Sequence, residues 1–187
     1  MSYKKTIKVP NDVSVYYFRN KNILIVKNKS KNKAIKLKLK LEFLNNGREI
    51  LVLTPVFLAN KKIFKYVKAL KGLTASLIKK SFLNVSTSFF KKLKIVGVGY
   101  KVFVIDYRNF RVLHLKLGYS HSIYIRVPCG ISVKSSKSNV LFIFGASNEE
   151  VQKFSNLVKK CKKPEPYKGK GIFFDNETIK LKVGKVI

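Results

Sequence analysis

The segment KAIKLKLKLEFL, at residues 33–44, places the strongest constraint on the fold. From Ile35 to Phe43 its residues alternate: one face carries Lys36, Lys38, Lys40 and Glu42, and the other carries Ile35, Leu37, Leu39, Leu41 and Phe43. A period of two predicts a half-buried strand with a basic outer face. The NNG turn at 45–47 then predicts that residues 49–57 return as its hairpin partner. Residues 13–18 and 23–28 predict two more strands, joined by a polar turn at 19–22.

The pattern changes in the middle of the chain. Between Lys62 and Asn84 the apolar residues recur at helical spacing, which predicts one long helix with Gly72 as a weak point. A second series of strand-like segments begins near Phe89, at residues 92–106, 110–119, 122–128, 131–135 and 139–145. The GVG of residues 97–99 lacks the third glycine and the following helix of a dinucleotide-binding loop. A strand bulge or the close packing of a neighbouring backbone is therefore the better interpretation.

A second helix follows this second series of strands. Ser147 precedes Glu150 by three residues, which predicts a capping box, and apolar residues from Val151 to Cys161 recur at helical spacing. Pro164 is predicted to end the helix. The order of several strands and then one helix thus occurs twice. We predict an α+β protein of two similar domains, residues 1–86 and 87–187, each a small antiparallel β-sheet packed with one main α-helix.

Positive charge dominates the composition. Forty Lys and Arg residues against nine Asp and Glu residues give a net charge of +31. A folded chain with this charge repels itself unless a polyanion neutralises it, so nucleic acid is the leading partner and an anionic membrane surface is the alternative. No apolar run approaches the length of a membrane span. Lysine greatly exceeds arginine, which phosphate binding does not require and which indicates an AT-rich genome of an organelle or a bacterium.

The sequence gives no support to catalytic or metal chemistry. Its acidic residues form no tuned acid–base pair. The residues His114, His121, Cys129 and Cys161 match no compact zinc spacing and no Cys/His nucleophile motif, so structural or turn roles are the better interpretation. We expect no enzyme, no metal and no cofactor. Two cysteines do not make a disulfide scaffold, and we see no signal core or presequence at the N-terminus.

The densest basic cluster follows the second helix, in the segment KKPEPYKGKGI at 162–172. Its prolines and glycines exclude a regular helix or a central strand. The prolines fix the direction of the chain, and the glycines let backbone N–H groups approach phosphate. Tyr167 either stacks on a base or packs on its own domain. The predicted polyanion-binding residues are Lys159, Lys160, Lys162, Lys163, Tyr167, Lys168, Gly169, Lys170 and Gly171.

Three motifs of the second half carry a family resemblance. KKLKIVGVGYKV (91–102), LKLGYSHSI (115–123) and KKPEPYKGKGI (162–172) resemble, in order and spacing, the second domain of the bacterial-type L6 family of ribosomal proteins. The first half resembles the family weakly, through VPNDVSV, ILIVKN and the helix near 69–84. The resemblance implies two α+β domains in a structural protein without catalytic activity. It also implies binding to large-subunit rRNA near the stalk base and the sarcin–ricin loop, beside other large-subunit proteins and docking translational GTPases, with no homo-oligomer.

The same resemblance implies RNA contacts at the KGKG of residues 168–171 and a tight turn at GYSH, residues 118–121. Phe173 stands where the family usually has a basic residue, which implies one phosphate contact fewer. The shortened basic tail and the AT-biased composition imply an organelle-encoded protein of a mitochondrial ribosome, with an AT-rich bacterium or a plastid as the alternative. The alternative functions are a cationic membrane-surface protein and a nucleic-acid-binding protein outside the ribosome.

Overall fold

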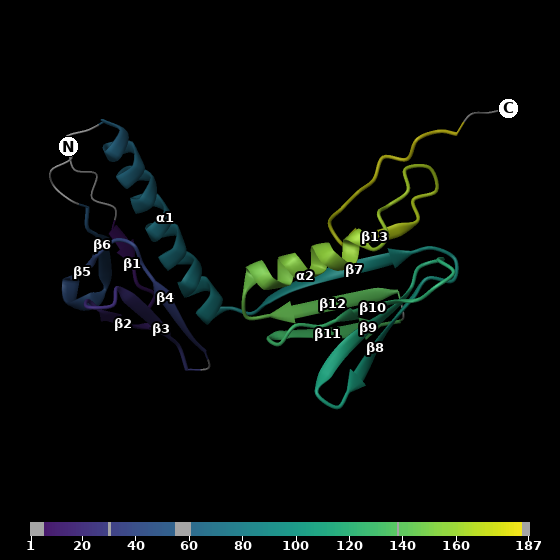
Figure 1. The fold of residues 1–187 in the computed structure, drawn as a ribbon, viewed down its shortest axis with the longest axis horizontal. Coiled ribbons are helices and arrows are strands. Elements are labelled where there is room, and N and C mark those ends of the chain that lie inside the picture. Colours follow the sequence, from purple (N-terminus) through teal and green to yellow (C-terminus); the bar gives the residue numbers. More distant parts are fainter. Residues whose placement is uncertain (1–5, 30, 55–60, 138, 185–187) are drawn as a thin grey trace. The chain divides into compact units, whose positions relative to one another are not determined.

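The structure is a computed structural model of the chain, and it describes residues 6–29, 31–54, 61–137 and 139–184 (Figure 1). The chain divides into two compact units, of which the first ends at Thr87 and the second begins at Ser88. Each unit has a hydrophobic core of its own.

The first unit arranges its strands in two antiparallel sheets beside one helix. One sheet has the order β2-β3-β4, and the other has the order β1-β6-β5. Both sheets contribute to one core, which contains Leu24 and Ile50 from the strands and Ile78 from the helix. The strands are β1 (Thr6–Lys8), β2 (Ser14–Phe18), β3 (Ile23–Lys27), β4 (Asn32–Lys36), β5 (Leu41–Leu44) and β6 (Glu49–Val52).

The segment 33–44 is not one strand, which corrects the prediction. Its first residues lie in β4 and its last four in β5, which belongs to the other sheet. Between them, the N–H of Leu37 donates to the carbonyl of Asn22 at 2.8 Å, and the carbonyl of Lys40 accepts from the N–H of Leu53 at 3.0 Å. Leu37 and Leu41 are nevertheless both buried. Because the two sheets share a core, the alternation continues across the change of sheet and does not reveal it.

The predicted hairpin after this segment is confirmed for β5 and β6, which pair antiparallel from Leu41↔Val52 to Leu44↔Glu49. All three residues of the NNG turn (η1, Asn45–Gly47) have positive φ angles, from 52° to 85°. Asparagine and glycine tolerate this left-handed conformation better than other residues. Residues 55–57, the end of the predicted partner strand, lie outside the described residues.

The predicted long helix is confirmed as α1 (Lys61–Ser86). Its second half packs on the core of the first unit through Ala75, Ile78, Phe82 and Val85. Its first turns are largely exposed. Gly72 lies inside the helix, and a Cβ placed on it would meet no atom within 4 Å.

The second unit also has two antiparallel sheets beside one helix. Their orders are β10-β9-β8 and β11-β12-β7-β13. The core of this unit contains Leu113 from the first sheet, Ile143 from the second and Phe154 from the helix. The strands are β7 (Phe89–Val96), β8 (Lys101–Tyr107), β9 (Phe110–Lys116), β10 (Ile123–Arg126), β11 (Ile131–Ser136), β12 (Val140–Gly145) and β13 (Gly171–Phe174).

Residues 92–106 are likewise divided between two strands, β7 and β8, which lie in different sheets. The turn between them brings the ring of Tyr100 over Gly97, where a Cβ would lie 2.5 Å from Cδ2 of the ring. The same ring covers Gly118, where a Cβ would lie 2.8 Å from Cε1. Gly97 and Gly118 therefore allow close packing, but against the Tyr100 side chain rather than against a neighbouring backbone, and Gly99 has no atom within 4 Å of an added Cβ. The Tyr100 ring contacts both the GVGY motif and the GYSH motif.

The second helix, α2 (Asn148–Lys160), packs on the sheet β11-β12-β7-β13 through Val151, Phe154 and Val158 (Figure 1). Ser147 occupies the N-cap position, but its side chain makes no capping hydrogen bond, so the predicted capping box is wrong. Its backbone carbonyl instead accepts from the N–H of Val151. The helix ends at Lys160, before Pro164 is reached.

The predicted α+β class is confirmed, with antiparallel strands and one main helix in each unit. The strands of each unit are divided between two sheets rather than gathered in one. Neither α1 nor α2, the helices of the described ranges, is long and apolar enough to cross a membrane.

Candidate nucleic-acid interface

The basic loop, defined here as residues 162–170, connects α2 to β13 and is closed by three backbone hydrogen bonds. The N–H of Ile172 donates to the carbonyl of Lys162 at 3.1 Å at its base. Nearer the tip, the N–H of Glu165 donates to the carbonyl of Lys170 at 2.9 Å. The N–H of Gly169 donates to the carbonyl of Glu165 at 3.0 Å. The loop therefore has a defined shape, and the N–H of Gly169 is used within it.

Both predicted glycines of the loop have a structural reason. Gly169 has a φ of +65°, in the left-handed region that favours glycine. Gly171 has a φ of +150°, and a Cβ on it would lie 2.7 Å from Cα of Pro164. The close approach that the sequence assigned to phosphate is thus made at Gly171 by the chain's own Pro164.

Most of the predicted side chains of the loop face solvent. Lys160, Lys163 and Lys168 are exposed, and Lys170 is half-buried. Tyr167 is 56% exposed, so a large part of its side chain is open to solvent. Glu165 is the one acidic residue of the basic loop.

The GYSH turn, residues 118–121, lies against the base of the basic loop. The hydroxyl of Tyr119 donates to the carbonyl of Cys161 at 3.1 Å, and Nζ of Lys162 lies 4.0 Å from the centre of the Tyr119 ring. The ring of His121 stacks on the ring of Tyr119, with 5.7 Å between the ring centres. Tyr119 and His121 therefore belong to the same surface as the lysines. The sequence motif marked this turn but gave no sign that it meets the loop.

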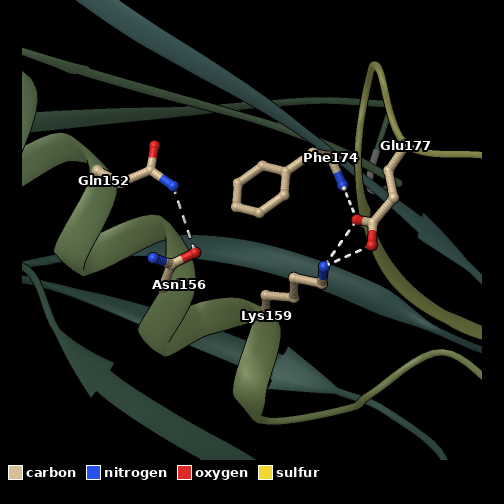
Figure 2. Close-up of polar contacts among 5 residues, drawn as sticks. All are labelled: Gln152, Asn156, Lys159, Phe174 and Glu177. Atoms are coloured by element: carbon tan, nitrogen blue, oxygen red, sulfur yellow. Dashed lines mark hydrogen bonds and ion pairs between the residues drawn. The ribbon is translucent and has the colours of Figure 1, made fainter.

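Lys159 makes its contacts inside the chain. Its Nζ donates to Oε1 and Oε2 of Glu177 at 2.6 and 2.7 Å and lies 5.0 Å from the centre of the Phe174 ring (Figure 2). Oε2 of Glu177 also accepts from the N–H of Phe174 at 3.3 Å. The Lys159 ammonium group is the main cause that holds the pKa of Glu177 below its ordinary value. Lys159 thus fastens the end of α2 to the chain after β13.

Asp175, which directly follows β13, pairs with two lysines of the neighbouring strand β7. Its Oδ1 lies 2.7 Å from Nζ of Lys94 and 3.1 Å from Nζ of Lys92, both on β7. These hydrogen bonds, with that of Lys94 the larger, lower the pKa of the Asp175 carboxyl. The acidic residues after β13 therefore pair with Lys92, Lys94 and Lys159, and within the described residues no ion pair involves a lysine of the basic loop.

The chain after β13 returns along the basic loop. The N–H of Lys182 donates to the carbonyl of Pro166 at 2.9 Å, and a Cβ on Gly169 would meet Leu181 at 3.3 Å. Lys180 and Lys182 are exposed on this segment. They extend the basic surface by two cations that no sequence motif marked.

The arrangement suits a phosphate backbone better than a small molecule. The basic loop presents cations and the exposed Tyr167, and the adjoining GYSH turn adds the stacked pair of Tyr119 and His121. Proteins bind RNA with such combinations, in which cations attract phosphates and aromatic rings contact bases or sugars. Cys161, between the helix and the loop, is half-buried, and burial raises the pKa of its thiol, which leaves it a poor nucleophile.

Comparisons with known proteins identify the family of this chain. The family model described as ribosomal protein L6 matches residues 96–174, a span that includes the GYSH turn, the basic loop and β13. The large ribosomal subunit protein uL6m of Reclinomonas americana is 34% identical to this chain over 182 residues, which cover 97% of the chain and 96% of the relative. The chain belongs to the ribosomal protein L6 family.

Bacterial members of the L6 family are also similar to this chain. The large ribosomal subunit protein uL6 of Malacoplasma penetrans is 39% identical over 146 residues, 78% of this chain and 74% of the relative. That of Nitratidesulfovibrio vulgaris is 43% identical over 121 residues, 65% of each chain. Both mitochondrial and bacterial members of the L6 family therefore align with this sequence.

Proposed function

We propose that this L6 family member is a structural constituent of the large ribosomal subunit and binds large-subunit rRNA through the basic loop, the GYSH turn and the returning segment with Lys180 and Lys182. The observation that carries the proposal is the closed basic loop. Lys163, Lys168 and Tyr167 are exposed, Lys162 and Lys170 are half-buried, and the backbone bonds of the loop fix its shape. A surface that is ordered before binding loses less entropy on contact with RNA.

The proposed contact is made at the stalk base and the sarcin–ricin loop, where translational GTPases dock, as the family resemblance implies. Lys160, Lys162, Lys163, Lys168 and Lys170 are the proposed phosphate-binding side chains, and Tyr167 stacks on a base or sugar. Gly169 and Gly171 shape the loop. Lys159 contributes by fixing the chain around Glu177 rather than by meeting phosphate directly, because its ammonium group is already paired.

The proposed location is a mitochondrial ribosome. The AT-biased composition and the full-length similarity to a mitochondrial relative support it, while the similarity to bacterial relatives keeps a bacterial ribosome as the alternative.

Co-sedimentation tests the function and the location together. The tagged full-length chain is added to large subunits purified from mitochondria, or from bacteria, that have been depleted of their own L6 protein. We expect stoichiometric sedimentation with the depleted large subunit and none with small subunits. Footprinting of the bound rRNA is expected to protect the sarcin–ricin loop and stalk base. Equal sedimentation with both subunits would contradict the proposal, since it would reduce the binding to unspecific attraction between charges.

A further inference from the structure

The sheet β10-β9-β8 of the second unit has one core face and one open face. Val102, Leu113 and Leu115 point into the core and are at most 1% exposed. Because side chains alternate along a strand, the neighbours of these residues lie on the open face. The rings there, which we call the aromatic face, are Phe103, Tyr107, Phe110, His114 and Tyr124.

Three of these rings form a column across the strands. His114 pairs in register with Phe103 on β8 and with Tyr124 on β10. The ring centres are 5.8 Å apart for Phe103 and His114, and 4.8 Å apart for His114 and Tyr124, with an angle of 8° between the latter planes. These separations are close to the spacing of strands, so the rings stand on the sheet and stack side by side.

The column ends on an edge strand. β10 is the last strand of its sheet, and the Tyr124 side chain is 63% exposed. The ring face of Tyr124 that points away from His114 is therefore open to another flat ring. Nε2 of His114 is buried in the column and has no hydrogen-bond partner among the described residues.

A second ring pair borders a hollow at the end of the same face. Tyr107 and Phe110 stack with centres 5.4 Å apart, and the guanidinium of Arg126 lies 5.1 Å from the centre of the Phe110 ring. These three residues line an open hollow of about 420 Å³. Asp106 and Arg111, which alternate onto the other face of the sheet, also line the hollow, and the Asp106 carboxylate is paired with Nε of Arg111 at 2.7 Å.

The charge of the aromatic face is positive. Lys101 and Lys116 lie opposite each other in register, and Arg126 follows Tyr124 by two residues, so all three share the face with the rings. None of the residues that alternate onto this face from β8, β9 and β10 is acidic. The face therefore complements a ligand that is anionic and has flat rings.

We propose that the aromatic face is a second RNA-binding surface, which takes unpaired nucleotides by stacking a base on Tyr124 and placing the adjoining phosphates on Lys116 and Arg126. Single-stranded RNA combines unstacked bases with a continuous anionic backbone, whereas a double helix hides its base faces. An apolar protein surface would supply no anionic group to Lys101, Lys116 and Arg126. The inference shares with the proposed function the assumption that the partner is RNA, but it uses none of the residues of the basic loop.

Binding of a short, labelled, single-stranded oligoadenylate to the full-length chain tests the proposal. Fluorescence anisotropy is measured at raised salt, where ionic contacts are weakened and stacking persists. Replacing Tyr124 by Ala is expected to weaken binding about 5- to 150-fold, and Tyr124→Phe is expected to bind within about twofold of the original chain, because phenylalanine also stacks. Tyr16→Ala, at a tyrosine 55% exposed on a strand of the first unit, is the matched control and is expected to change nothing.

One further variant keeps the test decisive if Tyr124→Ala disturbs the column. Lys116→Gln leaves every ring in place and is expected to make the slope of log K against log salt shallower by about 0.7 on single-stranded RNA. Unchanged binding by both Tyr124→Ala and Lys116→Gln overturns the proposal, as does equal loss in Tyr124→Phe and Tyr124→Ala.

The loop variant Lys168→Glu with Lys170→Glu separates this inference from the proposed function. If it loses large-subunit rRNA while Tyr124→Ala keeps oligoadenylate, the basic loop stands and the aromatic face fails. If Tyr124→Ala loses oligoadenylate while the loop variant keeps rRNA, the aromatic face stands and the proposed function fails.

Discussion

Lys159 on the last turn of α2 donates to both carboxylate oxygens of Glu177, at 2.6 and 2.7 Å, in the chain that follows β13. The pair joins the helix that precedes the basic loop to the chain that follows β13, the strand after the loop. The sequence predicts Lys159 to be a phosphate ligand, but the structure pairs it with Glu177, so it fixes the chain on either side of the basic loop. Its loss is expected to act on RNA binding through the shape of the loop.

Replacing Glu177 by Gln is expected to lower the free energy of unfolding of the second unit by about 0.5–1 kcal/mol at neutral pH, since the pair is partly exposed. The pKa of Glu177 is lowered by folding from its ordinary value of 4.5. The stabilisation is therefore complete above pH 4.5 and is lost as the pH falls through the lower pKa of the folded state. Urea unfolding of both chains at pH 6 and pH 3 measures the difference, which should shrink at pH 3.

The matched control for this experiment is Glu165→Gln, which removes the same charge from an exposed side chain of the basic loop. It is expected to leave the free energy of unfolding unchanged at both pH values. A difference between Glu177→Gln and the original chain that stays constant with pH would show that the Lys159–Glu177 pair does not stabilise the fold.

Reversing two charges of the basic loop, with Lys168→Glu and Lys170→Glu, is expected to weaken binding to a large-subunit rRNA fragment on the order of tenfold or more. Both side chains extend from a loop whose shape is set by backbone bonds, so the circular dichroism spectrum and urea midpoint should not change. The double variant Lys38→Glu with Lys40→Glu makes the same charge change at exposed residues of the first unit. Equal losses in the two double variants would show that net charge alone governs binding.

The salt dependence of rRNA binding should report the number of loop phosphate contacts. Five of the predicted lysines remain once Lys159 is counted as paired: Lys160 at the end of α2, and Lys162, Lys163, Lys168 and Lys170 in the basic loop. At about 0.9 counterions per phosphate, the slope of log K against log salt is expected to be about −4 to −5, and shallower by about 2 in the double variant. Filter binding over a series of salt concentrations measures it, and an affinity independent of salt would rule out the loop as a phosphate clamp.

Two glycine substitutions are expected to act in opposite directions. Gly118→Ala should destabilise the second unit by about 2 kcal/mol or more, because its φ is +71° and the added methyl would lie 2.8 Å from the Tyr100 ring. Gly72→Ala should stabilise the first unit by about 0.5–1 kcal/mol, since it lies inside α1 with open space around it. Urea unfolding of the full chain measures both. A neutral Gly118→Ala would contradict the packing of Tyr100.

The long helices and most strands follow from periodicity, because burial of one face imposes it on the sequence. The misplaced boundaries have a common cause. At 37–40 and at 97–100 the chain passes from one sheet to another while its apolar residues keep facing the same core. Periodicity records the direction of the core and not the identity of the neighbouring strand, so both changes of sheet are invisible in it.

The sequence predicted the part of the candidate interface that depends on residue type alone, and it did not predict the contacts between distant residues. The basic loop follows from its lysines, prolines and glycines. The pairing of Lys159 with Glu177, the approach of Tyr119 to Lys162 and the return of Lys182 to Pro166 join residues 16 to 43 positions apart in the sequence. Such contacts depend on how strands and helix are packed, which no local pattern encodes.

Tyr100 gives the second unit a dependence between its interior and its surface. One ring, 9% exposed, is the shared wall of the turns at Gly97 and Gly118, and the next residue after Gly118 is the tyrosine that holds Lys162. A substitution that displaced this ring would move Lys162, one of the proposed phosphate-binding lysines, without altering any residue of the basic loop. The two glycines and the tyrosine are consequently expected to change only together among relatives, as a single inherited unit divided between two distant stretches of sequence.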